Sequence, residues 1–217
     1  MSPRNFAAIL ALLTVGCSAA QTAISDKPET PFKLATFDGR VGLVLGETIL
    51  DIGAANEHLV REAGLPALEI PTEMRALIEG YDGVKSRLYQ MANFFNGKTD
   101  GLAFAHDAGT AKIEAPIQYP FNLLAAAANY QSHAAEMDTA VNVNIDTEMP
   151  FLFAKSPRSC IIGTGEPYFI PRGRERIDWE AELGIVVGKP AREVPLENAL
   201  DYVFGFTAVY DVSDRGG

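Results

Sequence analysis

The sequence predicts a mixed α+β, strand-rich chain in which a small α/β domain precedes a second domain. Residues 32–52 show short alternating apolar segments joined by turn signals, and residues 53–95 show apolar residues at helical spacing. From residue 121 onward, short strand patterns dominate. Pro116 and Pro120 indicate a joint near residue 118, so we assign residues 32–118 to a small N-terminal domain and 119–217 to a second domain.

The first domain begins with three predicted strands. Phe32–Phe37 alternates apolar and polar residues, Asp38-Gly39 is a turn signal, and Val41–Leu45 forms the returning strand. Gly46-Glu47 turns the chain again, into Thr48–Ile52. Tight turns between short strands predict a small antiparallel sheet, and the helical segment 53–95 is expected to pack on it.

The second domain is predicted to contain short strands and short helices. The expected strands are Asn122–Ala128, Pro150–Lys155, Leu183–Val187 and Val203–Tyr210, and the expected helices are Ser132–Met137 and Leu196–Asp201.

The first twenty residues show the pattern of an export signal, and residues 21–31 read as a linker. Arg4 precedes the uncharged apolar run Phe6–Val15, which is too short to span a bilayer, and small residues follow. Two cleavages remain open: Ser18-x-Ala20 suits ordinary signal peptidase, whereas Thr14–Cys17 resembles a lipobox in which a lipidated Cys17 would tether the chain to a membrane. Either way we expect an exported protein, periplasmic or an outer-envelope lipoprotein.

Charge and cysteine content narrow the class of protein. The formal net charge is −10, and no stretch gathers Lys and Arg, which argues against nucleic acid as a partner. Only Cys17 and Cys160 are present, so no disulfide is expected. Because Cys160 lies in an apolar run, we expect it to be buried.

The acidic pair Glu180 and Glu182 is the strongest chemical feature. Side chains alternate along a strand, so both carboxylates point to one face, where a hard cation such as Mg²⁺ would relieve their repulsion. Asp211, at the end of the apolar strand Val203–Tyr210, offers a third carboxylate. Taken alone, the E-x-E pattern also fits a solvent-facing strand edge.

A second feature is the pair His133 and Glu136. Three residues apart on a helix, they lie on one face, where the carboxylate would orient the imidazole as a general base. An isolated pair of this kind also fits a helix surface. His58 and His106 lie in polar contexts and are expected at the surface.

Four motifs together resemble the fumarylacetoacetate hydrolase family, in its short acylpyruvase and oxaloacetate decarboxylase-like branch. They are N-Y-x-x-H-A-x-E at 129–136, P-x-L-F-x-K at 150–155, E-A-E-L-G-I-V-V-G-K at 180–189 and D-Y-V-F-G-F-T…D-V-S-x-R at 201–215. The resemblance covers roughly residues 32–217 and is densest from 129 to 215. It implies a β-roll catalytic domain behind the small leading domain.

The resemblance also implies roles for individual residues. Mg²⁺ or Mn²⁺ would be held by Glu180, Glu182 and Asp211. The catalytic dyad would be His133 and Glu136, and the substrate would be bound by Arg215, Lys155 and Tyr130. For Lys155, a structural salt bridge is an equal alternative.

The implied reaction is cleavage of a C–C bond in a small 2,4-diketo acid through a metal-stabilised enolate, in a homodimeric hydrolase. Other reactions of the family remain alternatives: isomerisation or tautomerisation, decarboxylation, or dehydration of a 2-keto acid. A catalytically silent exported binding protein is a further alternative. Gly216-Gly217 departs from the family pattern, and the family's domain normally continues through a catalytic lysine, so we expect the β-roll to be incomplete and truncated at its C-terminus.

Overall fold

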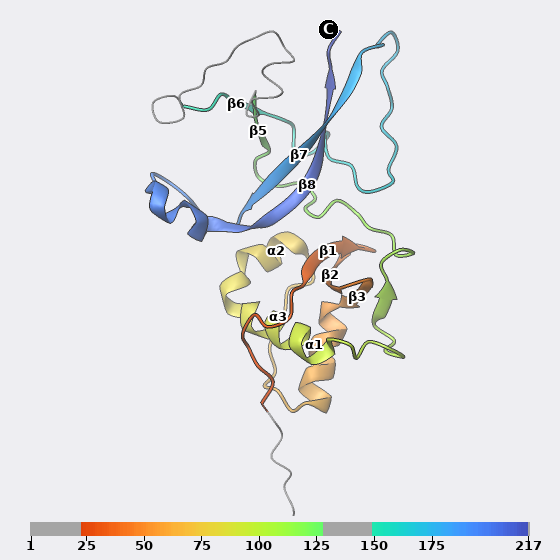
Figure 1. Ribbon diagram of the computed structural model, residues 1–217, viewed down its shortest axis with the longest axis vertical. Helices are drawn as coiled ribbons and strands as arrows, with labels where there is room; N and C mark the ends of the chain where they lie inside the picture. Colours follow the sequence, from red (N-terminus) through yellow and green to blue (C-terminus); the bar gives the residue numbers. More distant parts are fainter. Residues whose placement is uncertain (1–22, 128–148, 217) are drawn as a thin grey trace, which may run out of the picture.

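A computed structural model describes residues 23–127 and 149–216 (Figure 1). The helices and strands in chain order are β1 (Lys33–Phe37), β2 (Arg40–Leu45), β3 (Thr48–Asp51), α1 (Ile52–Glu62), α2 (Met74–Glu79), α3 (Tyr81–Phe95), β4 (Ala105–Asp107), β5 (Leu124–Ala126), β6 (Leu152–Ala154), β7 (Ile177–Val187), the 3₁₀ helix η1 (Leu196–Tyr202) and β8 (Val203–Asp214). The predicted export signal and the predicted helix around His133 lie outside the described residues.

The first sheet has the order β1-β2-β3-β4, with every neighbouring pair antiparallel. Asp38 and Gly39 both have positive φ, 47° and 75°, as a tight two-residue hairpin turn requires. The three predicted strands and their turns are therefore confirmed. The short strand β4 was not predicted; it pairs with β3 and completes the sheet.

Three helices cover this sheet and enclose the main core. Asp51 begins α1 by accepting hydrogen bonds from the backbone N–H groups of Gly53 and Ala54. The helical segment predicted at 53–95 is broken between α1 and α2, where Pro66 and Pro71 cannot donate to a helix. The core cluster consists of Val41, Leu43, Leu50, Ile52, Ala55, Leu59, Ile70, Met74, Leu77, Ile78, Val84, Leu88, Met91, Ala92 and Phe95.

The rest of the described chain forms two small antiparallel sheets, β5–β6 and β7–β8. The β7–β8 hairpin is long: its register runs from Ile177 opposite Asp214 to Val187 opposite Val203. Both strands extend beyond the apolar segments that predicted them, because cross-strand pairing also recruits their polar ends. The sequence predicted Asp211 at the end of a strand. It lies inside β8 instead, because β8 continues to Asp214.

One end of this hairpin contacts the first core. Val186 and Phe204 pack against the core cluster, and the Phe204 ring meets the Tyr81 ring edge-on at a centroid distance of 4.9 Å. Burial, aided by a hydrogen bond with Tyr89, raises the pKa of Tyr81 to about 12. Lys189 adds an ion pair with Asp82 at 3.6 Å. The hairpin is thus anchored on the helical layer (Figure 1).

Three expectations about single residues were wrong. Cys160 is exposed and not buried, because its segment forms no strand that packs on a core. His58 and His106 are half-buried and not at the surface: the His58 ring lies 5.5 Å from those of Phe95 and Phe104, and the His106 ring lies 5.3 Å from that of Phe37. Each histidine packs as an aromatic side chain at the edge of the first core.

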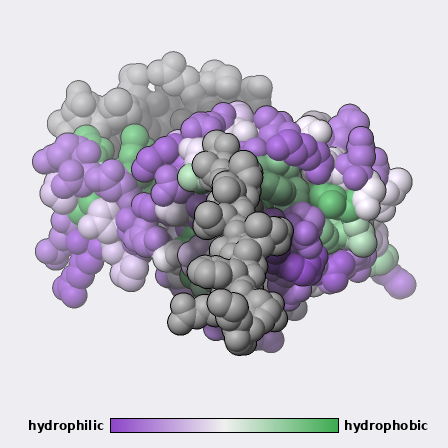
Figure 2. Space-filling view, turned by 90° about the horizontal axis from the view of Figure 1, so that it is seen from below, coloured by the Kyte–Doolittle hydropathy of each residue, from purple (hydrophilic) through white to green (hydrophobic). Residues whose placement is uncertain are grey.

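The surface of the N-terminal end is largely hydrophilic, with apolar residues gathered in small patches (Figure 2). No helix in the described ranges, 23–127 and 149–216, is long and apolar enough to cross a membrane.

Candidate functional site

The candidate site lies on the polar face of the β7–β8 hairpin. Glu180 on β7 stands directly opposite Asp211 on β8, and Glu182 follows two residues along β7 on the same face. The opposite face of β7 carries apolar side chains, including Trp179 and Leu183. The alternation of the strand therefore gathers the carboxylates on one side, as the sequence predicted for Glu180 and Glu182.

A cation from a third strand reaches this face. Lys155 directly follows β6, and its ammonium group forms an ion pair with the Asp211 carboxylate. Both side chains are largely shielded from solvent, with exposed fractions of 26% for Lys155 and 11% for Asp211. The contact brings together residues 56 positions apart in the sequence.

Arg215 supplies a second cation, just beyond the end of β8. Its backbone N–H donates to the Arg176 carbonyl at 2.8 Å, which continues the hairpin ladder and fixes the position of the side chain. The guanidinium group forms ion pairs with Glu180 and, through Nε at 3.2 Å, with Asp178. A planar fork of donors suits two carboxylates at once.

Asp178 is the member of this group that the sequence reasoning missed. It precedes Glu180 and Glu182 by two and four positions on β7, so the same alternation places it on their face. The pattern D-x-E-x-E was therefore a readable signal. Four carboxylates and two cations lie on this face, which leaves an excess of negative charge and of hard oxygen donors.

The donor set fits a divalent cation in chemistry and in register. Mg²⁺ and Mn²⁺ bind carboxylate oxygens, and two of these stand on paired strands at one position of the ladder. Within the part of the chain that the structure describes, no three acidic, His or Cys side chains are gathered closely enough to hold an ion. Lys155 and Arg215 instead contact Asp211 and Glu180.

Three further predicted site residues, His133, Glu136 and Tyr130, lie outside the described residues. The structure thus joins Glu180, Asp211, Lys155 and Arg215 in one set of contacts and places Glu182 on the same face, while the catalytic dyad stays a prediction.

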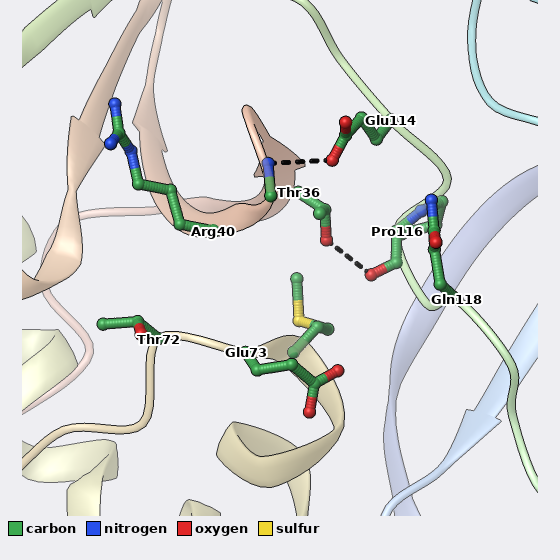
Figure 3. Close-up of a pocket in the computed structure, with 9 residues that line it drawn as sticks. Thr36, Arg40, Thr72, Glu73, Glu114, Pro116 and Gln118 are labelled. Atoms are coloured by element: carbon green, nitrogen blue, oxygen red, sulfur yellow. Dashed lines mark hydrogen bonds between the residues drawn. The ribbon is translucent and has the colours of Figure 1, made fainter.

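A separate small pocket lies beside the β1–β2 hairpin (Figure 3). Its volume is about 120 Å³. Thr36 Oγ1 donates to the Pro116 carbonyl at 2.7 Å, and the Gly39 N–H donates to Glu114 at 2.9 Å, which ties the β1–β2 hairpin to the segment that follows β4. The pocket is lined by Thr36, Gly39, Arg40, Thr72, Glu73, Met74, Glu114, Pro116 and Gln118, none of which is a predicted site residue.

Comparison with known families places the polar hairpin inside a recognised domain. Residues 122–216 match the model of the fumarylacetoacetate (FAA) hydrolase C-terminal domain.

Curated relatives extend the similarity to most of the chain. It is 31% identical to the oxaloacetate tautomerase YisK of Bacillus subtilis over 181 residues, which are 81% of this chain and 56% of that protein. It is 30% identical over 200 residues to a mitochondrial oxaloacetate tautomerase of Xenopus laevis, covering 88% of this chain and 55% of that protein. The chain therefore spans about half the length of these relatives.

Solved structures show the same similarity. The crystal structure of maleylpyruvate hydrolase from Sphingobium sp. SYK-6, in complex with manganese(II) and pyruvate, aligns with a TM-score of 0.59 at 28% identity, covering 85% of this chain and 60% of that one. A putative HpcE protein from Mycobacterium smegmatis aligns with a TM-score of 0.60 at 27% identity, covering 84% of this chain and 55% of that one.

Proposed function

We propose that the chain belongs to the fumarylacetoacetate hydrolase family and forms part of a metal-dependent enzyme that cleaves a C–C bond in a small 2,4-diketo acid. The observation that carries this proposal is the polar face of the β7–β8 hairpin, where Glu180 stands opposite Asp211 beside two cations. A neighbour of similar fold is a maleylpyruvate hydrolase whose crystal structure holds manganese and pyruvate.

In this proposal the carboxylates of Glu180, Glu182 and Asp211 hold the ion. A bound divalent ion would act as a Lewis acid toward a carbonyl oxygen of the substrate and favour its enolate. Mn²⁺ and Mg²⁺ both suit carboxylate ligands, and the manganese in the neighbouring hydrolase supports the first of these.

The two cations of the site would bind the anionic substrate. Arg215 presents a planar fork that can hold a carboxylate through two parallel hydrogen bonds, and Lys155 presents a compact positive charge on a flexible stem. Tyr130 would add a hydroxyl group to this set. A keto acid carries one carboxylate and a neighbouring carbonyl group. The negative charge of that carboxylate matches the positive charges of Arg215 and Lys155.

Proton transfer falls to the predicted dyad. His133, oriented by Glu136, would take a proton from water, and the water oxygen would attack the carbonyl distal to the enolate. The C–C bond between the two halves then breaks, and the enolate half leaves and is protonated to a keto acid. The overall reaction converts one diketo acid and one water molecule into two acids.

Tautomerisation of a 2-keto acid is a second candidate. Two relatives that cover 81% and 88% of this chain are oxaloacetate tautomerases. The same dyad would then move a proton between carbon and oxygen of the substrate without adding water. Function depends on the pocket more than on the fold, so both reactions suit this family.

One assay separates the two reactions. Acylpyruvates and oxaloacetate absorb in the ultraviolet as enols, and released pyruvate can be counted with lactate dehydrogenase and NADH. For the hydrolase we expect Mn²⁺-dependent loss of absorbance with pyruvate formed in equal amount, stopped by EDTA and by Glu182→Gln. The matched control is Glu193→Gln, which changes an acid with a side chain 87% exposed and should leave the rate unchanged.

The outcomes are distinct. Faster enol–keto relaxation of oxaloacetate without pyruvate release would favour the tautomerase. If a folded protein changes none of these substrates in either way, the keto-acid assignment is wrong.

Export is a separate proposal that rests on the pattern of residues 1–20 alone. Mass spectrometry of the protein recovered from the cell envelope tests this proposal. We expect either a chain cleaved after Ala20 or a lipid on Cys17. An intact Met1 would contradict it.

A further inference from the structure

The ion pair between Lys155 and Asp211 raises a question that the proposed function leaves open. Asp211 is one of the three proposed ligands, yet its carboxylate is already bound by an ammonium group. An ammonium and a divalent cation repel one another strongly at the separation that one carboxylate allows, above all where water is partly excluded. Asp211 is only 11% exposed, so little solvent screens that repulsion.

The two cations of the site are held differently. Arg215 contacts Asp178 in addition to Glu180, so its guanidinium group keeps one carboxylate partner if Glu180 turns toward an ion. Lys155 contacts Asp211 alone among the ion pairs of the described residues.

The side chain of Lys155 is also more flexible than that of Arg215. Its charge sits at the end of a four-carbon stem, and its residue follows the short strand β6 and not the long hairpin. The side chain is 26% exposed, so it already reaches solvent on one side. We therefore expect Lys155 to leave Asp211 through a change of its own side-chain rotamer.

Resting on the function proposed above, we propose that Lys155 is an internal counter-cation that holds the place of the metal at Asp211. Binding of the divalent ion displaces the Lys155 ammonium group from Asp211. The ammonium group then turns toward the bound substrate. The exchange keeps Asp211 neutralised in both states. Metal and keto acid are thereby coupled: loading the ion frees the charge that receives the substrate carboxylate, and by linkage the substrate strengthens metal binding in turn.

Chemical footprinting of the full chain tests the displacement directly. Acetic anhydride modifies free amines, and mass spectrometry gives the rate at each lysine with and without Mn²⁺. We expect Lys155 to react about fivefold faster with Mn²⁺, which corresponds to release from an ion pair of about 1 kcal/mol. Lys189, paired with Asp82 at 3.6 Å away from the proposed ligands, is the internal control and should not change.

A binding measurement gives an independent readout. Calorimetric titration with Mn²⁺ alone should show about fivefold tighter binding for Lys155→Gln, because the competing charge is gone. Lys189→Gln should bind like the parent chain. If Lys155 merely braces β6 against β8, the substitution would loosen the site and weaken Mn²⁺ binding.

Each result decides the matter. Unchanged or slower modification of Lys155 in Mn²⁺, in a chain that does bind the ion, overturns this inference and leaves the proposed function standing. Absence of Mn²⁺ binding overturns both. Because the footprint is made on the parent chain, the test holds even if Lys155→Gln does not fold.

Discussion

The two regions of the molecule differ in where their apolar residues lie. In the described ranges, every buried apolar residue falls between Phe37 and Ala115. In these same ranges, every large exposed apolar residue falls between Tyr119 and Tyr210. The first region encloses its own core. The described residues of the second region form hairpins with one exposed apolar face and one charged face.

This difference separates stability from chemistry. Burial of apolar surface is the main favourable term in folding, so the first region should carry most of the free energy of unfolding. The second region carries the carboxylates and cations of the candidate site, and its described residues are held by strand pairing and ion pairs. Regions with few buried apolar contacts open more readily, as ligand sites often do.

The largest expected effect lies in the first core. Leu88 is fully buried, and Leu88→Ala should lower the free energy of unfolding by about 3 kcal/mol, through lost burial and a cavity. Leu183, 59% exposed on the hairpin, is the matched control, and Leu183→Ala should cost no more than about 0.5 kcal/mol. Urea denaturation measures both. Equal losses would abolish the contrast between the regions.

The next effect comes from a buried polar network. Arg87 is buried, its Nη1 contacts Asn56 Oδ1, and its Nη2 donates to the Pro66 carbonyl at 2.7 Å. Burial lowers the pKa of Arg87, but the group stays charged, so Asn56→Ala leaves a buried cation short of a partner. We expect a loss of about 2 kcal/mol in urea denaturation.

Its control is Asn198→Ala, at an exposed position of η1. A loss there as large as at Asn56 would mean that the network does not matter.

A smaller effect is expected where the two regions meet. Phe204→Ala removes the edge-on contact with Tyr81 and should cost about 1 kcal/mol. Because burial is the main cause of the raised pKa of Tyr81, opening its ring to water should bring that pKa down from about 12.

Ultraviolet titration of phenolate measures the shift, with Tyr81→Phe to identify the signal. The sign is fixed: the phenolate must appear at lower pH in the Phe204 variant. An unchanged titration would show that the hairpin does not shield Tyr81.

The smallest effect is expected in the exposed connection between β7 and η1. Arg192 and Glu193 form an ion pair at 3.9 Å with side chains 90% and 87% exposed. Thermal or urea denaturation of Arg192→Ala should match the parent within about 0.5 kcal/mol. A greater loss would reveal that this connection carries more of the fold than its exposure indicates.

Local patterns in the sequence predicted much of the fold. The turns at Asp38-Gly39 and after Leu45 depend on residues that tolerate positive φ, and the strands beside them on simple alternation. β4 was missed because three residues carry no period; it exists through pairing with β3. Cys160 was misplaced because apolar neighbours alone do not create a core.

The candidate site divides in the same way. Alternation was enough to place Glu180 and Glu182 on one face, and it would have added Asp178. The register that sets Glu180 opposite Asp211 is a non-local property of two strands. The contact of Lys155 with Asp211 depends on a third strand far away in sequence, which no spacing rule predicts.

The central claim is that the polar face of the β7–β8 hairpin holds a divalent ion. Calorimetric titration with Mn²⁺ tests it most directly, using the parent chain, Glu182→Gln, Asp211→Asn and the exposed control Glu193→Gln. We predict one ion per chain for the parent and the control, and affinity lowered at least about tenfold in the other two variants. Equal Mn²⁺ affinity in all four proteins, or none in the parent, would contradict the claim.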